Sequence, residues 1–453
     1  MATRDAAAGI RAMKPAYIQK MPLELLSDIF KLSIAEPRHA MLDGVSVGLR
    51  RPAPWSLGHV CRSWRATTLG YPALWNTLLV KLTTDAAAVE EQLLRAGARD
   101  ADAPLYVCFD LRSLPDVPQS VLDLIIPTSK RWVGLQLRNA QLIVLRPPSS
   151  HDDWIAGLAG KLPRLERLEI FNCGSWQPPK GVFTTAPRLT RVLTTCAGTG
   201  RDELSPSVDL PWAQLTHYCG AVDDPMGYLP HLSLAANTLV ECVLGGPDRP
   251  RDEDNHPNSI LFLPRLRRLH LVEGKLLEYI TTPELQDLCL WSNTRGLQDH
   301  EFRTLVPFLQ RSGCALRSLV LARFNFGPSL TADLLNAVPL LEELRVEGAH
   351  SYSQDRIFDA LERCDSVPCL RQLTYGYQKR LMLKEAVLAA VTARVPTMQT
   401  LLLYEVVGDP ISEEDPWIRE VKELGVDVKC VSLDDALIER KCWGDYEYFS
   451  SRS

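Results

Sequence analysis

Apolar residues recur along most of the chain in the pattern L-x-x-L-x-L, with other apolar residues replacing some of the leucines. The copies begin at Trp132, and the first positions of ten copies, two of them degenerate, run from Leu165 to Met398. These ten span 233 residues in nine intervals, a mean period of about 26 residues. The last two apolar residues of each copy alternate with other residues, as in a strand that buries one face. The pattern therefore predicts one short strand per copy, followed by a turn and a returning segment.

Helical returns are predicted between several of these copies, because apolar residues recur there at helical spacing. They cover residues 299–310, 331–338 and 383–395. In many copies a proline stands two residues before the first leucine, as at Pro163, Pro187 and Pro264, where it would end the returning helix. The sequence thus predicts stacked strand–turn–helix units, with strands on the inside and helices on the outside.

This period and pattern resemble those of leucine-rich repeats, whose units have 20 to 29 residues. Individual intervals vary from 19 residues, between Leu266 and Leu285, to 31 residues, between Leu285 and Leu316, so the array is irregular. Cys173 and Asn293 occupy the slot in which leucine-rich repeats place an asparagine or cysteine, but other copies have glycine, phenylalanine or alanine there. The resemblance implies an α/β fold, an irregular leucine-rich-repeat solenoid.

A first amphipathic helix is predicted near the N-terminus. Pro22 suits the first turn of a helix, and Leu23, Leu26, Ile29 and Phe30 follow it at positions i, i+3, i+6 and i+7. These four residues form one apolar helical face, which must pack against another element.

A second helix is predicted over residues 56–66, with Ser56 as a plausible N-cap. Leu57, Val60, Cys61 and Trp64 lie at i, i+3, i+4 and i+7. Residues 72–75, which include Leu74 and Trp75, begin a third short turn. The core that the three pieces form together is too small to be stable on its own.

The blocks PLELLSDIF, VCRSWR and PALW closely resemble the F-box, a three-helix module through which substrate receptors dock on the Skp-family adaptor of SCF (Skp, cullin, F-box) ubiquitin ligases. Residues 36–54 form a longer insertion than the compact F-box has, as in fungal F-box proteins. The resemblance implies that ten residues form the module, some packing internally and some presented to the adaptor. They are Pro22, Leu23, Ile29, Phe30, Leu57, Val60, Cys61, Trp64, Leu74 and Trp75. The alternative is a generic helical cap on the end of the larger domain.

The domain organisation that follows has five parts. Residues 1–20 are predicted to be a flexible N-terminus, 21–80 the F-box, and 81–124 a connecting or capping segment. Residues 125–430 are predicted to be the leucine-rich-repeat-like domain. Residues 431–453, which are rich in aromatic side chains, are predicted to be a C-terminal cap or tail.

In a solenoid, the strand residues between the leucines face one continuous surface. We expect this surface to bind a partner, and its candidate contact residues are Phe171, Arg268, His270, Trp291, Arg345 and Tyr404. Their mixture of charged and aromatic side chains suits a protein partner more than a polyanion.

Composition and charge narrow the functional classes. The 453 residues are 46% hydrophobic and carry a net charge of −5, far from the basic excess of a nucleic-acid-binding protein. No window approaches the ~20 apolar residues that span a bilayer, and the N-terminus lacks the apolar core of a secretory signal. We therefore expect no nucleic acid and no membrane as partners, and a cytoplasmic or nuclear location or both.

No candidate catalytic or metal site stands out. The common nucleotide-binding, hydrolase and metalloprotease motifs do not occur, and the twelve cysteines include no CxxC pair. Cys364 or Cys369 with His350 could be drawn as a nucleophile and its base. The residues between the histidine and the cysteines, however, match the pattern of a helix and the start of a repeat. We expect no catalytic residues, no metal and no cofactor.

The resemblances together imply a non-catalytic substrate receptor of an SCF-type ubiquitin ligase. Its F-box would hold the Skp-family adaptor, and through it a cullin-RING ligase, while its repeat surface would bind an unknown target protein. The alternative is an F-box-containing interaction scaffold that acts outside a ligase.

Overall fold

The computed structural model of the 453-residue chain describes eighteen stretches of it. They are residues 21–33, 54–81, 83–97, 100–110, 117–138, 153–171, 179–194, 208–221, 225–245, 259–272, 274–291, 299–322, 328–347, 355–363, 366–377, 384–405, 412 and 414–431. The chain forms two compact units, Met1–Arg138 (unit 1) and Asn139–Ser453 (unit 2). The predicted N-terminal segment 1–20 lies outside the described residues, and so does the predicted C-terminal cap or tail 431–453 apart from Val431.

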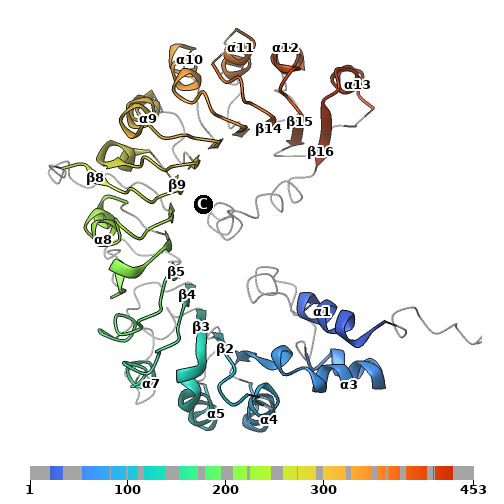
Figure 1. The fold of residues 1–453 in the computed structure, drawn as a ribbon, viewed down its shortest axis with the longest axis vertical. Coiled ribbons are helices and arrows are strands. Elements are labelled where there is room, and N and C mark those ends of the chain that lie inside the picture. The colour runs from blue at the N-terminus through green and yellow to red at the C-terminus, as the bar shows by residue number, and fades with distance from the viewer. Residues whose placement is uncertain are drawn as a thin grey trace, which may run out of the picture. The chain divides into compact units, whose positions relative to one another are not determined.

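Unit 1 begins with a helical module. It consists of helix α1 (Leu23–Ser33), 3₁₀ turn η2 (Leu57–His59), helix α3 (Arg62–Gly70) and 3₁₀ turn η3 (Pro72–Trp75) (Figure 1). The predicted helices exist, but the second one begins later than expected. Ser56 makes no capping hydrogen bond, and Cys61 is the N-cap of α3, where its Sγ accepts a hydrogen bond from Trp64 N at 3.5 Å. The capping position therefore goes to a residue that the apolar pattern had placed inside the helix.

The rest of unit 1 is a small parallel sheet. Strands β1 (Thr77–Val80), β2 (Leu105–Asp110) and β3 (Trp132–Arg138) pair in that order. Helix α4 (Ala86–Ala96) joins the first two, and α5 (Gln119–Ile125) with η4 (Ile126–Arg131) joins the last two. The segment predicted to connect or cap thus carries regular elements. The sequence of β2 does not alternate between apolar and polar residues, because Val107, Cys108 and Phe109 are all buried. The pattern therefore gave no sign of this strand.

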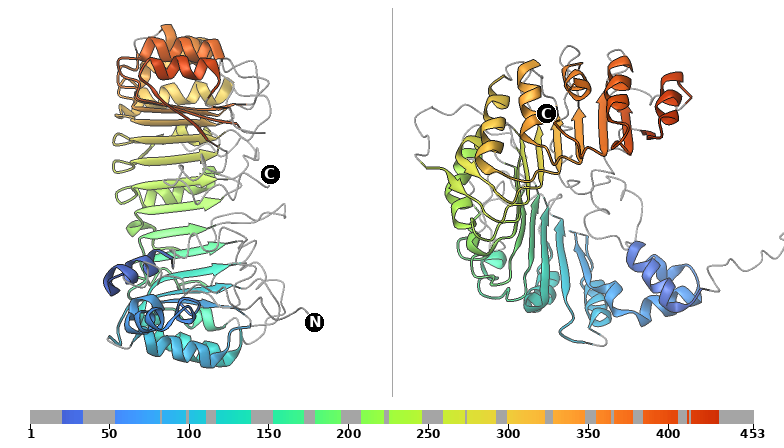
Figure 2. Two further views of the ribbon diagram at one scale, coloured as in Figure 1. Left: turned by 90° about the vertical axis from the view of Figure 1, so that its right-hand side faces the viewer. Right: turned by 45° about the horizontal axis from the view of Figure 1, so that its top comes forward.

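Unit 2 has a parallel sheet whose strands follow the chain order, with one strand from each of the ten copies of the apolar pattern from Leu165 to Met398 and one more strand after the last copy. Figure 2 shows these strands side by side, pointing in the same direction. The strands are β4 (Arg167–Phe171), β5 (Arg191–Thr194), β6 (His217–Ala221), β7 (Glu241–Gly245), β9 (Arg268–Val272), β11 (Asp287–Trp291), β12 (Ser318–Ala322), β13 (Glu343–Glu347), β14 (Gln372–Tyr377), β15 (Thr400–Glu405) and β16 (Asp427–Val431). A second, two-stranded parallel sheet pairs β8 (Leu261–Phe262) with β10 (Ile280–Thr281). The predicted α/β repeat fold is confirmed.

The return segments of unit 2 change in kind along the chain. The first half uses short pieces: α7 (Asp153–Ala156), η5 (Trp212–Gln214), η6 (Pro225–Tyr228), α8 (Leu229–Leu234) and η7 (Lys275–Tyr279). The second half uses helices α9 (Asp299–Ser312), α10 (Pro328–Ala337), α11 (Asp355–Arg363), α12 (Lys384–Arg394) and α13 (Pro416–Glu423). Those predicted over 299–310, 331–338 and 383–395 are confirmed. The described helices of unit 2 lie along one side of the sheet (Figure 1), and we call the other side, which carries none of them, the helix-free face.

The pattern leucines form the core. All ten first positions from Leu165 to Met398 are buried, and so are the strand residues that follow them in register from Leu168 to Val428. A backbone turn recurs before each strand: Leu189 N donates to Ala186 O, and Thr190 N and Arg191 N both donate to Glu166 O of the preceding unit. The same bonds recur in later units, so equivalent residues of successive units lie in the same place on the edge of the sheet.

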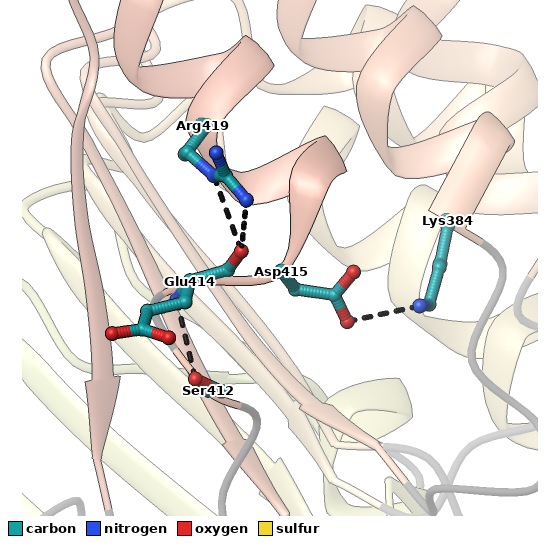
Figure 3. Close-up of polar contacts among 5 residues, drawn as sticks. All are labelled: Lys384, Ser412, Glu414, Asp415 and Arg419. Atoms are coloured by element: carbon teal, nitrogen blue, oxygen red, sulfur yellow. Dashed lines mark hydrogen bonds and ion pairs between the residues drawn. The ribbon is translucent and has the colours of Figure 1, made fainter.

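The last two helices of unit 2 are joined by polar contacts on the surface. Figure 3 shows Lys384 Nζ at 3.0 Å from Asp415 Oδ2, and Arg419 donating two hydrogen bonds to Glu414 O at 3.2 and 2.9 Å. Glu414 N donates to Ser412 Oγ at 3.2 Å. Such exposed pairs contribute little stability, so the buried apolar residues of α12 and α13 must hold these helices on the sheet.

Candidate protein-interaction surfaces

The helical module of unit 1 is held together by aromatic side chains. The ring of Phe30, which is buried, meets the ring of Trp64 edge-to-face at 4.8 Å between centroids. Trp75 is also buried, and its Nε1 donates a hydrogen bond to Thr68 O at 2.8 Å. Leu74 completes this core. Aromatic pairs of this geometry add about 0.5–1.5 kcal/mol beyond their burial, which helps so small a core to stay ordered.

Large apolar side chains are exposed on the same module. Five of them, which we call the exposed apolar group, are Leu23, Leu25, Ile29, Val60 and Leu69, with exposed fractions of 55%, 55%, 39%, 60% and 47%. They come from α1, from the residue after η2, and from α3. Single exposed leucines are ordinary, and several on one small helical module make it a candidate interaction surface.

The structure shows which of the ten residues of the F-box resemblance are buried and which are exposed, a distinction that the sequence could not make. Phe30, Leu74 and Trp75 are buried, Leu57, Cys61 and Trp64 are half-buried, and Pro22, Leu23, Ile29 and Val60 are exposed.

The sequence reasoning missed two members of the exposed apolar group, Leu25 and Leu69. Leu25 falls outside the i, i+3 spacing of α1, and Leu69 lies beyond the predicted end of the second helix, which in fact continues to Gly70. A search for apolar residues outside the predicted helical face would have found Leu25.

The six candidate contact residues of the repeat domain do lie on the helix-free face, but their exposure differs. Arg268 is the most open, with 45% of its side chain exposed, and it lies 3.5 Å from Glu241 and 3.2 Å from Asp287. Phe171 and Trp291, at the strand ends, are half-buried. These three are the predicted contact residues that a partner can reach most readily.

The other three candidates are mainly packing residues. His270 is 8% exposed and Tyr404 is fully buried. Arg345 lies over the Tyr404 ring at 5.0 Å and forms an ion pair with Glu347 at 2.9 Å. Strand neighbours stand close on both sides in the middle of a sheet, and they screen one another from solvent. A strand position that faces outward in the pattern is therefore not always exposed.

Two carboxyl groups on this face have raised pKa values. Partial burial raises the pKa of Asp287, and the opposing effect of Arg268 does not cancel it. Burial also raises the pKa of Glu343, and the charges of Asp287 and Glu342 add to that shift. Burial is thus the main cause of both shifts, and nearby carboxylates add only to that of Glu343.

The cysteines give no sign of nucleophilic chemistry among the described residues. Burial raises the pKa of the Cys242 thiol to about 12, which keeps it protonated, and burial also raises the pKa of Cys314. Of the nucleophile–base arrangement named from the sequence, Cys364 and His350 lie outside the described residues, and Cys369 is half-buried.

Within the described ranges, no three histidine, cysteine, aspartate or glutamate side chains gather in a way that would hold a metal ion. The helices in those ranges also fall short of the length and apolar character that a bilayer crossing requires.

Comparison with known proteins adds one structural likeness. No family model and no curated protein matches the chain. Among solved structures, the chain is similar to the leucine-rich repeat-containing protein LegL7 from Legionella pneumophila, with 14% identity and a TM-score of 0.37 over 77% of this chain and 97% of that one. The leucine-rich-repeat-like fold of unit 2 rests on its own strands, their register and their buried leucines.

Proposed function

We propose that the chain is a non-catalytic substrate receptor of an SCF-type ubiquitin ligase. In this proposal the helical module of unit 1 docks on a Skp-family adaptor, and the repeat domain of unit 2 binds a target protein. Ubiquitin transfer belongs to other subunits, and the receptor acts by raising the concentration of the target near them.

The exposed apolar group carries this proposal. It lies on the segments whose sequence resembles an F-box, and its members Leu23, Ile29 and Val60 are among the residues that the resemblance assigns to the module. Complete burial of such a side chain contributes about 1.5–3 kcal/mol, so a few of them are enough to anchor a stable complex. In this proposal Phe30 and Trp64, whose rings pack edge-to-face, belong to the core of the module and do not contact the partner.

The test is binding of the full chain to a purified Skp-family adaptor, measured by co-purification and calorimetry. We expect a one-to-one complex. The double substitution Leu23→Ser with Val60→Ser should weaken it by about a hundredfold, since two buried anchors of about 1.5 kcal/mol each are removed. Both side chains are exposed, so the variant should keep its fold.

A matched control is available in the same unit. Leu94, on α4, is 64% exposed but lies outside the helical module, so Leu94→Ser should leave adaptor binding unchanged. If the wild-type chain does not bind the adaptor, or if Leu94→Ser weakens binding as much as the double substitution, adaptor docking by this surface is refuted. An interaction scaffold that acts outside a ligase would then remain.

A further inference from the structure

Unit 2 carries a group of cationic side chains at the edge of its sheet where the strands begin. Lys161 and Arg188 lie in the turns before β4 and β5, and Arg191 is the first residue of β5. All three are exposed, and no carboxylate among the described residues lies within ion-pair distance of them. Arg164, in the turn before β4, adds a fourth cation. We call these four residues the basic edge.

Three arginines further along the same edge are neutralised, whereas Arg265 and Arg371 are exposed and have no ion pair among the described residues. Arg267 lies 3.3 Å from Glu284, and Arg317 lies 3.4 Å from Glu342; in each pair the carboxylate belongs to the next unit of the array. Arg268 pairs with carboxylates on both neighbouring strands. The array thus supplies acidic partners for Arg267, Arg268 and Arg317. Lys161, Arg188 and Arg191, in the adjacent β4 and β5 units, have no such partner among the described residues.

The repeat places the four cations together. Arg164 and Arg188 each follow the proline that precedes a first leucine, so they are equivalent residues of adjacent units. Arg191 is paired in register with Arg167, whose own charge is neutralised by Glu169. The turn of Lys161 is tied to the turn of Arg188, because Gly160 N donates a hydrogen bond to Thr185 Oγ1 at 3.0 Å.

The backbone around Arg188 is also held firmly. The side chain of Gln214, from the next unit, donates hydrogen bonds from Nε2 to Ala186 O at 2.7 Å and to Leu189 O at 2.9 Å. These two carbonyls lie on either side of Arg188. A turn fixed in this way presents its arginine with little loss of backbone freedom on binding, which favours affinity.

We infer that the basic edge binds an acidic segment of the target protein. The inference rests on the proposed function, because it assigns a class of ligand to the repeat domain of the receptor. Glutamate and aspartate side chains in an extended segment would supply the carboxylates that the array provides elsewhere from its own chain. Two acids lie near these turns, Glu166 and Asp209, whose Oδ2 accepts a hydrogen bond from Gly181 N, so the four cations of the basic edge outnumber them.

A short acidic protein segment fits this edge better than a nucleic acid does. The basic edge has four cations, and further along the same edge lie Glu284, Asp287, Glu342 and Glu343. Those carboxylates would repel an extended polyanion, and the whole chain has a net charge of −5. Recognition is therefore confined to a few acidic residues that meet the β4 and β5 units.

The test uses the full chain and a fluorescein-labelled peptide rich in Glu and Asp, with two comparison ligands. These are the same peptide with Gln and Asn in place of the acids, and an oligo-dT single strand. We expect the acidic peptide to bind and the neutral peptide not to bind. Arg188→Glu with Arg191→Glu should weaken peptide binding by about tenfold or more, because attraction becomes repulsion.

The matched control is Arg267→Glu with Arg317→Glu, which makes the same change of charge at exposed residues of the same edge. We expect this control to leave peptide binding within about twofold of the wild type, since these arginines already have partners. No preference for the acidic peptide over the neutral one, an equal loss in both variants, or tighter binding of the oligonucleotide would each overturn the inference.

Adaptor binding is measured on the same samples. The basic edge lies in unit 2 and the exposed apolar group in unit 1, so Arg188→Glu with Arg191→Glu should bind the adaptor normally. Failure of the wild-type chain to bind the adaptor would remove the ligase function, and binding of the acidic peptide would then be judged separately.

Discussion

Tyr404 fills the place where a side chain at Gly376 would stand. The two residues are paired in register on β15 and β14, and a Cβ atom at Gly376 would lie 2.5 Å from both Cζ and Oη of the tyrosine. Tyr404 is fully buried and packs with Leu402 and Val431 on the helix-free face. Because Gly376 has no side chain, Tyr404 can pack in a second small apolar cluster on the helix-free face, separate from the leucine core.

We predict that Gly376→Ala destabilises the protein by about 1–3 kcal/mol, because the fully buried Tyr404 ring must move to admit a methyl group. The measurement is the shift of the urea unfolding midpoint. Gly245→Ala is the control: it is also a strand glycine of the helix-free face, and its Cβ would meet only Val272 Cγ2 at 3.9 Å, an ordinary contact. Equal shifts for the two variants would contradict the role given to Tyr404.

At the scale of elements, ion pairs link strands across the helix-free face. Arg268 on β9 lies between Glu241 on β7 and Asp287 on β11, so one guanidinium joins three adjacent strands. Asp287 depends on this arginine, since burial disfavours its charge and Arg268 opposes that effect. The strands are held in order chiefly by backbone bonds and buried leucines, and these ion pairs add to that order.

We predict that Arg268→Ala costs about 0.5–1 kcal/mol of unfolding free energy near neutral pH and less near pH 4. Without the arginine, the pKa of Asp287 in the folded state rises further above that in the unfolded chain. The folded state then holds the proton more tightly, so the stability of the variant falls as pH rises through that raised pKa.

Unfolding curves at the two pH values test this prediction. Arg317→Ala is the control, because Arg317 is more exposed and pairs with one carboxylate, Glu342, at 3.4 Å. We expect a smaller cost for the control at both pH values. A cost of Arg268→Ala that does not depend on pH would show that Asp287 is not the group whose charge the arginine supports.

At the scale of the molecule, the helical module is part of a larger unit. The guanidinium of Arg95, on α4, lies 4.3 Å from the ring centre of Trp75 and 4.6 Å from that of Trp55. Gln92 Nε2 donates hydrogen bonds to Trp75 O at 3.2 Å and to Thr77 O at 2.7 Å. Helix α4 therefore completes the core of the module, although the sequence pattern ends the module at residue 80.

We predict that a fragment of residues 1–138 unfolds cooperatively on heating, whereas residues 1–85 do not, because the shorter fragment lacks α4 and exposes Trp75. Near-UV circular dichroism, which reports fixed aromatic packing, is the measurement. Arg95→Ala in the longer fragment should lower its melting temperature, because it removes the cation that contacts the rings of Trp55 and Trp75. Cooperative unfolding of residues 1–85 would contradict the role of α4.

The repeat architecture was predictable from the sequence, because a buried strand position repeated every 19 to 31 residues leaves few other ways to bury so many leucines. The leucines from Leu165 to Met398 and the helices over 299–310, 331–338 and 383–395 were placed correctly. Strand β2 was missed, since it is buried on both faces and shows no alternation. Leu25 and Leu69 were missed because exposure is not a property of the apolar pattern.

The sequence by itself therefore determined which residues alternate, and with that the parallel sheet and its leucine core. Only the tertiary structure decided which outward positions are reachable: Arg268 is open, while Tyr404 is buried over Gly376. It also decided which charges are neutralised, since the partners of Arg267 and Arg317 come from the next unit and Arg188 and Arg191 have none there. The physical reason is that periodicity is a local property of the chain, whereas exposure and ion pairing depend on neighbours that are distant in the sequence.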